Sequence, residues 1–420
     1  MDGRMVVVSE QPQDYNDENV HYHAAIVDDI CQRCLSEIKQ YWKLPNGKRY
    51  CWNCATYGRI DEDKWLKCYA ETHDFEMISE DYDTWAGTLT LLQTSVAQSL
   101  LTGIQKNKDQ LLYAVTGAGK TEMLFPAIKW AIKCRKRIAY VSPRVDVIRE
   151  IAPRIMAHFK LSYTMMHGEV TDTFAYTQLT FATIHQLYKF YHAFDLIIVD
   201  EADAYPLSGN QSLWYVLAQA RSDQSVMIYM TATLNQDLKR LMRLGQVQVQ
   251  NLLQRFHGYQ LPNIKISKVM RCWDKCFPID IVNQFKQKSA PWLIFVPMID
   301  DLDTLKQHLK KLDLSLRIAC ISSQTNDRET LIQKLKNGEI DVLCTTIILE
   351  RGVTIADVQI IILGADEGAY SDETLLQIAG RSGRDINFPD GKIIAYCQED
   401  TMQLKRVRGI IDDINRKYNM

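Results

Sequence analysis

Short apolar runs that alternate with helix-like stretches are the feature that most limits the folds open to this chain. The first block contains LLYAV, RIAYVS, FDLIIVD and SVMIYMTAT, and the alternation starts again with WLIFVP, RIACIS, DVLCTT, VQIIIL and KIIAYC. Strands buried on both faces have continuous apolar runs, and the helices between them make successive strands parallel. The sequence therefore predicts an α/β protein with two doubly wound parallel-sheet lobes.

The same alternation predicts the domain boundaries. Residues 82–250 form the expected first lobe and residues 251–420 the second, each of an ordinary domain size. The polar, glutamine-rich segment 243–263 is the expected hinge between them. Upstream of the lobes, we expect a small module over residues 26–81 and a tail over residues 1–25.

Charge and apolar run length exclude two classes of protein. The formal net charge of −2 argues against a globally basic nucleic-acid coat, although it allows a local basic groove. The longest apolar runs are far shorter than the roughly 18 residues of a membrane span, and the N-terminus lacks the pattern of a signal peptide. We therefore expect a cytoplasmic protein with reduced cysteines and no integral membrane segment.

The segment AVTGAGKTEM at 114–123 lies between an apolar run and a helix-like stretch. Glycines in this context let backbone N–H groups and a helix N-terminus approach phosphate oxygens. Lys120 is the expected contact of the β- and γ-phosphates, and Thr121 is the expected ligand of Mg²⁺. The candidate cofactor-binding residues of this loop are Gly117, Ala118, Gly119, Lys120 and Thr121.

The loop departs at one position from the pattern G-x-x-x-x-G-K-[ST], because Ala114 stands where the pattern has Gly. Alone, it could be a glycine-rich turn with a surface lysine. A second motif, FDLIIVDEAD at 194–203, argues against that alternative, and a buried strand leading into it argues against a solvated acidic loop. Asp200 is the expected Mg²⁺ ligand, and Glu201 is expected to orient or deprotonate the attacking water. Together the motifs predict a nucleoside triphosphatase that uses ATP and Mg²⁺.

Further motifs, in order along the chain, resemble those of superfamily 2 helicases and translocases. Gln93, in WAGTLTLLQ (85–93), is implied as the adenine contact, and Gly352, in TTIILERGVT (345–354), as a nucleotide-binding residue of the second lobe. The resemblance implies RecA-like lobes, with segments that hold a nucleic-acid backbone and one that couples hydrolysis to movement. The other matching segments are SPRVDV (142–147), ATIHQL (182–187), MTAT (230–233), IFVP (294–297) and QIAGRSGR (377–384).

The last of these segments carries the arginines that we expect to act in catalysis. Arg381 and Arg384 are spaced to bring positive charge to the γ-phosphate across the cleft between the lobes. Gln377 is expected one helical turn before Arg381, on the same face of a helix. ATP bound between Lys120 and these arginines would close the cleft, and hydrolysis would reopen it. The alternative is that both arginines belong to a solvated basic helix face.

Two cysteine pairs, CQRC (31–34) and CWNC (51–54), precede the first lobe. Their spacing places four thiolates within reach of one tetrahedral Zn²⁺, whereas the remaining cysteines are expected to be mostly small apolar core residues. Zinc binding would supply much of the folding free energy of so short a module. The predicted zinc ligands are Cys31, Cys34, Cys51 and Cys54.

Aromatic and basic residues are interleaved beside these cysteines, in YWKLPNGKRYCW and DKWLKCY. Aromatic faces such as those of Tyr41 and Trp52, next to lysines, suit stacking and phosphate contact with a single nucleic-acid strand. The same aromatics could instead cover the zinc site. The sequence leaves both alternatives open.

The order of a four-cysteine module, VTGAGKTE, VDEAD and QIAGRSGR resembles the ComFA family of bacterial competence proteins, over nearly the whole chain after residue 25. The resemblance implies a DNA-dependent ATPase that drives transforming single-stranded DNA through the membrane channel ComEC and works with ComFC. It is compatible with a homo-oligomer. Any attachment to the inner face of the cytoplasmic membrane would be peripheral.

Two other functions fit part of the sequence. A primosomal replication-restart helicase of the PriA type has a similar phosphate loop, but such proteins are much longer and carry zinc ligands within the second lobe. A catalytically silent nucleic-acid-binding scaffold would keep the lobes without turnover. The five charged residues Lys120, Asp200, Glu201, Arg381 and Arg384 argue against that third function.

Overall fold

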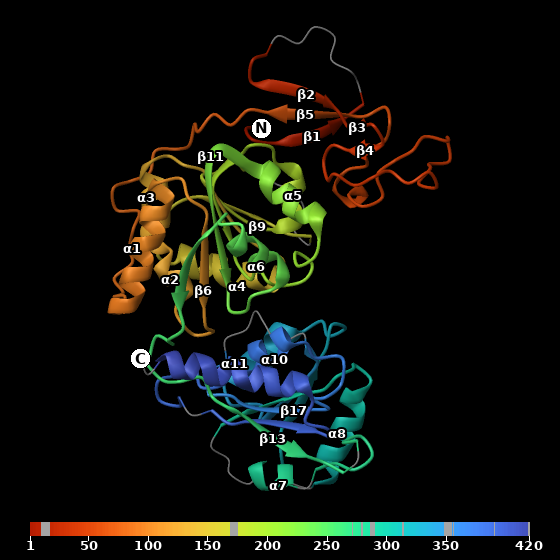
Figure 1. Cartoon of the computed structure of the whole chain (residues 1–420), viewed down its shortest axis with the longest axis vertical. Coiled ribbons are helices and arrows are strands. Elements are labelled where there is room, and N and C mark those ends of the chain that lie inside the picture. Colours follow the sequence, from red (N-terminus) through yellow and green to blue (C-terminus); the bar gives the residue numbers. More distant parts are fainter. Residues whose placement is uncertain are drawn as a thin grey trace. The chain divides into compact units, whose positions relative to one another are not determined.

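The computed structural model describes residues 1–9, 17–168, 175–270, 272–278, 280–285, 290–312, 315–347, 355, 357–389 and 391–418. The chain divides into two compact units (Figure 1). The first contains Met1–Ala114 and Lys120–Asn251, and the second contains Val115–Gly119 and Leu252–Met420. The short loop Val115–Gly119 is therefore part of the second unit, although the chain on both sides of it belongs to the first.

A seven-stranded sheet forms the centre of the first unit, with the strand order β12-β6-β11-β10-β7-β9-β8. The pairs formed by β10, β11, β7, β9 and β8 are parallel, as is the pair of β11 with β6. All six residues of β10 are buried, as expected for a central strand covered on both faces. The strands are β12 (Gln248–Leu252), β6 (Gln110–Ala114), β11 (Arg221–Thr231), β10 (Phe194–Val199), β7 (Ile138–Ser142), β9 (Leu179–Thr183) and β8 (Tyr163–Met166).

Helices connect these strands, and several begin at a capping side chain. The Thr90 hydroxyl accepts a hydrogen bond from the Gln93 N–H, and the Gln93 side chain accepts one from the Thr90 N–H, which is a capping box. Asn210 and Asn235 cap two later helices through their side-chain oxygens. The helices are α1 (Leu91–Gln105), α2 (Lys120–Met123), α3 (Phe125–Lys133), α4 (Val145–Met156), η2 (Ile184–Lys189), α5 (Gln211–Ala220) and α6 (Gln236–Arg243).

The N-terminal residues form a three-stranded antiparallel sheet, β1-β5-β2, and a two-stranded ribbon, β3-β4. Residues 1–25, predicted as a tail, thus contain two strands. Met5 and Leu66 of this module share one hydrophobic core cluster with Leu187 and Leu213 of the seven-stranded lobe, so the described part of the module packs on the core of that lobe. Its elements are β1 (Met5–Val8), β2 (Val20–Ala24), β3 (Ile26–Val27), β4 (Ile30–Cys31), η1 (Ala55–Tyr57) and β5 (Trp65–Tyr69).

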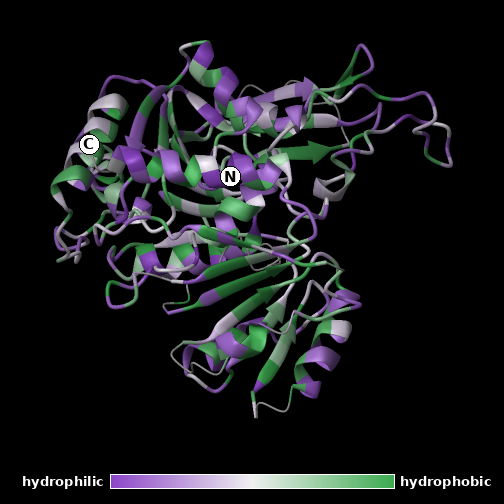
Figure 2. Cartoon of the chain, turned by 60° about the horizontal axis from the view of Figure 1, so that its bottom comes forward, coloured by the Kyte–Doolittle hydropathy of each residue, from purple (hydrophilic) through white to green (hydrophobic). Residues whose placement is uncertain are grey.

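The second unit contains a six-stranded parallel sheet with the order β13-β18-β17-β14-β16-β15. Figure 2 shows its strands as mostly hydrophobic, whereas its helices mix hydrophobic and hydrophilic residues. The strands are β13 (Ile264–Lys268), β14 (Trp292–Phe295), β15 (Ile318–Ile321), β16 (Val342–Thr345), β17 (Gln359–Leu363) and β18 (Ile393–Cys397). The helices are α7 (Asp280–Phe285), α8 (Asp301–Lys311), α9 (Arg328–Lys336), α10 (Asp372–Ala379) and α11 (Met402–Tyr418).

The prediction of two parallel-sheet α/β lobes is confirmed. Within segment 243–263, predicted as a hinge, the structure places β12, an edge strand of the first sheet. Among the residues that the structure describes, no helix has both the length and the apolar character that crossing a bilayer requires.

Candidate nucleotide and metal sites

The glycine-containing loop follows β6 and leads into α2, which begins at Lys120. Gly117 and Gly119 have φ angles of 80° and 74°, in the left-handed region that favours glycine. The Lys120 Nζ lies 3.5 Å from the carbonyl oxygen of Ala114, so the lysine folds back over the loop. The Thr121 side chain is buried at the first turn of the helix. The local geometry is therefore strand, turn and helix, as a phosphate-binding loop requires.

Sheet topology places the acidic motif at the same edge as this loop. The parallel strands β6, β11 and β10 are neighbours, so their carboxyl ends meet at one edge of the sheet. The loop follows Ala114, the MTAT segment ends β11, and Asp200 follows Val199 directly. The structure thus brings together at this edge three motifs that are distant in the sequence.

Hydrogen bonds hold the Asp200 carboxylate in one orientation. The Tyr140 hydroxyl, on the adjacent strand β7, donates to Oδ2 across 2.8 Å, and the Glu201 backbone N–H donates to Oδ1 across 2.9 Å. Burial, and then the Asp200 charge, raise the pKa of Tyr140 well above its usual value, so its hydroxyl stays a donor at neutral pH. Glu201 has a φ of 53°, which is uncommon for a residue with a side chain and is typical of functional turns.

The acidic motif and the MTAT segment are joined by buried hydrogen bonds. The Thr233 hydroxyl donates to Oδ2 of Asp203, and the Thr233 N–H donates to the Thr231 hydroxyl across 3.0 Å. All three residues are buried. A shift of the DEAD turn would therefore be transmitted to the end of β11.

Two residues upstream of the loop have structural contacts of their own. Gln93, predicted to contact adenine, accepts a hydrogen bond from the Thr90 N–H within the capping box of α1. The Trp85 ring lies edge-on to Phe125, with Lys129 Nζ 5.6 Å from its centroid. An adenine contact by Gln93 stays a prediction.

The second lobe holds the remaining predicted catalytic residues, and one prediction about them is wrong. Helix α10 ends at Ala379, so Arg381 and Arg384 lie in the turn after the helix and share no helical face with Gln377. Gly380 is the C-cap of this helix, and the chain continues with a four-residue turn in which the Arg381 N–H donates to the Ile378 carbonyl across 3.0 Å. Arg381 is buried, and Arg384 donates through Nε to the Gly380 carbonyl across 3.0 Å. The alternative of a solvated basic helix face is therefore wrong as well.

Some predicted residues have no described geometry or an unexpected neighbour. Gly352, together with residues 348–354 of its motif, lies outside the described residues. Segment 182–187, predicted to hold a nucleic-acid backbone, enters η2, where the His185 and Tyr188 rings stack on Tyr57 of the cysteine module. This face of η2 is therefore occupied by protein.

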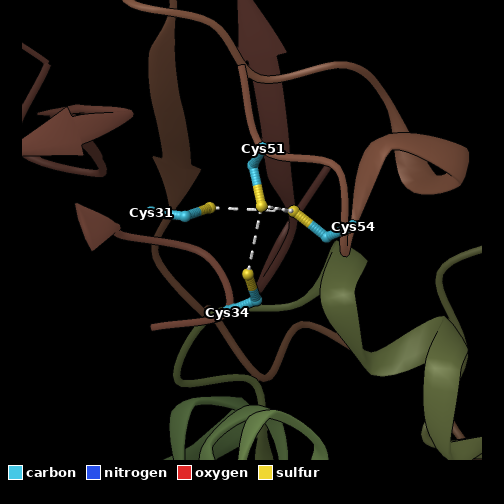
Figure 3. Close-up of side chains that lie close together, drawn as sticks. All are labelled: Cys31, Cys34, Cys51 and Cys54. Atoms are coloured by element: carbon cyan, nitrogen blue, oxygen red, sulfur yellow. Dashed lines mark hydrogen bonds between the residues drawn. The ribbon is translucent and has the colours of Figure 1, made fainter. Parts of the chain in front are cut away.

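The four predicted zinc ligands form one buried cluster (Figure 3). The sulfur atoms of Cys34 and Cys51, and of Cys51 and Cys54, are 3.5 Å apart, and those of Cys31 and Cys54 are 3.7 Å apart. A tetrahedral zinc ion with Zn–S bonds of about 2.3 Å requires sulfur separations of roughly 3.8 Å. These thiols therefore fit Zn²⁺ in number, chemistry and spacing.

Buried polar contacts surround this cluster. Arg33, between the first two cysteines, donates to the carbonyl oxygens of Cys54, Tyr57 and Gly58 across 2.5 to 2.6 Å. The Ser36 hydroxyl, which accepts from the Cys34 thiol, lies 3.3 Å from the Ser212 hydroxyl of α5. The cluster is thus bonded to the first lobe.

The exposed aromatic residues of the module do not cover the cysteines. Tyr41 is 79% exposed and Trp52 is 64% exposed, so covering the zinc site is not their role. Lys48 is paired with Asp63, and Arg49 with Asp29 and Glu62, so the neighbouring cations are largely neutralised within the module.

The sequence did not predict the roles of Tyr140 and Arg255 or the contact between Asp203 and Thr233. Tyr140 stands in the apolar run RIAYVS, where the one tyrosine among apolar residues was an available signal. Asp203 and Thr233 lie in two separate motifs, and no sequence pattern predicts the contact between them. Arg255 lies in the segment predicted as a hinge, and no sequence pattern marks it.

Two helicase families match the lobes. The DEAD/DEAH box helicase family matches residues 90–241, and the helicase conserved C-terminal domain matches residues 268–385. The matches leave the cysteine module outside.

Two competence proteins are similar to nearly the whole chain. Competence protein ComFA of Streptococcus pneumoniae (strain ATCC BAA-255 / R6) is 34% identical over 398 residues, a match that covers 93% of this chain and 91% of the relative. Competence protein ComFA of Bacillus subtilis (strain 168) is 31% identical over 405 residues, covering 92% and 85%. Both matches extend well beyond the two helicase families.

Solved helicase structures share the fold. S. cerevisiae Dbp5 bound to RNA and ADP BeF3 has a TM-score of 0.55 to this chain at 13% identity, covering 78% of this chain and 91% of Dbp5. At that identity the similarity concerns the fold alone, which is that of two RecA-type helicase lobes.

Proposed function

Because the chain belongs to the ComFA family of competence proteins, we propose that it is an ATP-driven translocase that draws transforming single-stranded DNA into the cytoplasm. The two helicase families support a helicase-like ATPase, and the two ComFA relatives support its link to competence. One observation carries the proposed chemistry: the phosphate loop and the acidic motif lie at one sheet edge, and Tyr140 and the Glu201 N–H already orient Asp200 there.

The loop after β6 is the proposed phosphate-binding segment. In this proposal the backbone N–H groups of Gly117, Ala118 and Gly119 donate to phosphate oxygens, and Lys120 places its charge on the β- and γ-phosphates. To reach the phosphates, the Lys120 side chain must leave the Ala114 carbonyl. Their 3.5 Å contact is at the outer limit of a hydrogen bond, so it opposes this movement only weakly.

The sheet edge also supplies ligands for Mg²⁺. The Thr121 hydroxyl and the Asp200 carboxylate fit this ion, which prefers oxygen ligands. When bound, Mg²⁺ would neutralise charge on the phosphate oxygens. Glu201 follows Asp200 on the turn and is placed by this proposal to orient the attacking water and accept its proton.

The second lobe completes the proposed site. Arg381 and Arg384 would stabilise charge on the γ-phosphate in the transition state, where an arginine is worth on the order of 10³ to 10⁵ in rate. Gln377 would act in catalysis together with these arginines, Gly352 would assist nucleotide binding from the same lobe, and Gln93 would contact adenine. The buried Thr233–Asp203 hydrogen bond supports a link between hydrolysis and strand movement.

Zinc is proposed for the four cysteines, whose sulfur separations support it. The proposed partners are single-stranded DNA, ComFC and the channel ComEC, with peripheral attachment to the inner face of the cytoplasmic membrane and assembly into a homo-oligomer. Family membership supports these partners.

Steady-state ATP hydrolysis by the purified protein tests the proposal. Turnover should be strongly stimulated by single-stranded DNA, less by duplex DNA or single-stranded RNA, and undetectable in Lys120→Ala, because removing a preorganised phosphate contact costs at least about a hundredfold in rate. Preference for branched duplex would instead favour a restart helicase. The absence of turnover with any nucleic acid would favour a silent scaffold.

A further inference from the structure

Arg255 lies in the segment that follows the last strand of the first sheet, beside the phosphate loop. Its segment follows β12, and the Val115 N–H donates to the Leu252 carbonyl across 3.1 Å while the Phe256 N–H donates to the Gly117 carbonyl across 3.0 Å. Residues 252–256 therefore run alongside the loop. The loop and this segment belong to the same compact unit.

The side chain of Arg255 lies against the loop glycine. A β-carbon built on Gly117 would be 3.8 Å from Cγ of Arg255 and 3.9 Å from its Cδ and Nε. These separations are ordinary van der Waals contacts, so the guanidinium base passes directly over the loop backbone. Only 2% of Arg255 is exposed.

The guanidinium lacks the partners that a buried cation requires. Its Nη1 donates to the Gly383 carbonyl, which also lies 3.1 Å from Nε2 of His257. Within the described part of the chain, Nε and Nη2 have no hydrogen-bond partner, and no carboxylate forms an ion pair with Arg255. A buried charge without compensation is costly, so such a group is informative.

Two other buried arginines are compensated in ways that Arg255 is not. Among the described residues, Nε and Nη2 of Arg137 also lack a hydrogen-bond partner, but this guanidinium is paired with the Glu71 carboxylate and lies over three aromatic rings. Arg33 donates to three carbonyl oxygens, and only its Nε lacks a partner there. Arg255 instead has another cation nearby: burial and the charge of Arg384 lower its pKa to about 9. The guanidinium remains charged at neutral pH, so a bound anion would offset both its burial and its repulsion from Arg384.

We propose that Arg255 binds a phosphate group of the nucleotide held by the loop, through Nε and Nη2. The inference rests on the proposed function, since it requires that the loop hold a nucleotide. A nucleic-acid backbone phosphate has the same chemistry, but the contact with Gly117 favours the nucleotide. Arg255 is thus a further ligand of the substrate, supplied by the chain directly after the last strand of the first sheet.

Nucleotide binding and thermal unfolding of Arg255→Gln test this inference, with Arg317→Gln as the control. Arg317 is exposed and pairs with Asp341, remote in sequence from every nucleotide motif, so its loss should change little. Loss of two charge-assisted hydrogen bonds should weaken Mg²⁺–AMP-PNP binding by Arg255→Gln at least about a hundredfold, and Arg255→Lys should be intermediate. Without nucleotide, the melting temperature of Arg255→Gln should equal or exceed that of the wild type.

Three outcomes would overturn the inference. A structural role would lower the melting temperature of nucleotide-free Arg255→Gln and leave the affinity of the folded variant for AMP-PNP unchanged, and failure of both Arg255→Gln and Arg255→Lys to fold would also assign a structural role. Weaker binding of a single-stranded oligonucleotide, with unchanged AMP-PNP binding, would assign the guanidinium to the nucleic-acid backbone. If the wild type does not bind AMP-PNP, the proposed function itself fails, and that result differs from a failure confined to the variant.

Discussion

The hydroxyl of Tyr140, on β7, donates a hydrogen bond across 2.8 Å to Oδ2 of Asp200, the residue that directly follows the neighbouring strand β10. The register pairs Val141 with Val199, so this contact follows from the pairing of β7 with β10. With Oδ1 bonded to the Glu201 N–H, both carboxylate oxygens have a fixed donor. Asp200 is therefore oriented before any ion or nucleotide binds.

Tyr140→Phe should lower the apparent affinity of the enzyme for Mg²⁺ during hydrolysis without abolishing turnover. A hydrogen bond to a charged group contributes about 1.5 to 3 kcal/mol, so half-saturation should require about ten- to a hundredfold more Mg²⁺. ATPase rates over a Mg²⁺ titration measure this. Tyr229→Phe is the control, because its hydroxyl contacts the Met227 sulfur and not Asp200. Equal Mg²⁺ dependence in wild type and Tyr140→Phe would contradict the role of this hydroxyl.

Glu201→Gln should separate nucleotide binding from hydrolysis. Asp200 keeps its carboxylate and both donors, so nucleotide and Mg²⁺ should bind with nearly unchanged affinity, whereas loss of the general base should slow turnover about 10²- to 10⁴-fold. Fluorescent-nucleotide binding and ATPase assays measure the two quantities. Loss of nucleotide binding would contradict the separation of roles between these residues.

Thr233→Val should uncouple hydrolysis from nucleic acid. The substitution removes the donor to the buried Asp203 carboxylate while keeping side-chain volume, so DNA stimulation should fall more than basal turnover, with a stability loss of about 1 to 3 kcal/mol. Thr180→Val is the matched control, since its buried hydroxyl has no hydrogen-bond partner among the described residues. If both variants keep full DNA stimulation, the coupling role is wrong.

Zinc removal should destabilise the first lobe as well as the module. Metal analysis of wild-type protein purified without chelator should find about one zinc per chain, and Cys51→Ser should lose most of it. Because the cysteines share a core with Leu213 and Leu217 of α5, the melting temperature of the whole first unit should fall. Zinc-free protein with an unchanged transition would show that the metal has no structural role.

Alkaline pH should weaken the fold through buried tyrosines. Burial, and then Asp109, raise the pKa of Tyr229 far above its unfolded value near 10. Above pH 10 the unfolded chain loses a proton that the native state keeps, so stability present below that pH is lost as pH rises, by about 1.4 kcal/mol per pH unit for each such tyrosine. Urea unfolding from pH 9 to 11 should therefore show a shallower decline for Tyr229→Phe. An identical decline would contradict the assignment.

Much of the fold followed from local patterns, because continuous apolar runs specify strands such as β10 that are covered on both faces. The cysteine cluster was also predictable, since the spacing of two short motifs brings four thiols together. Contacts between segments that are distant in the sequence were not predictable in this way. Tyr140 and Asp200 meet through strand register, and Arg255 reaches Gly117 because β12 lies beside β6. The end of α10 was not predictable either, because the helix ends at Ala379, before Arg381, and helical spacing alone does not indicate this end.

The N-terminal sheet has a consequence for the order of events during synthesis. Arg137 donates to the carbonyl of Asp2 across 2.8 Å, a contact that spans 135 residues. At about 5 to 20 residues per second, the ribosome adds those residues in on the order of ten seconds. The four cysteines therefore emerge and can gather before Ser212 and α5, which lie against them in the finished protein, have been translated. In the cell, the cysteine cluster is therefore synthesised before the part of the first lobe that later shares its core.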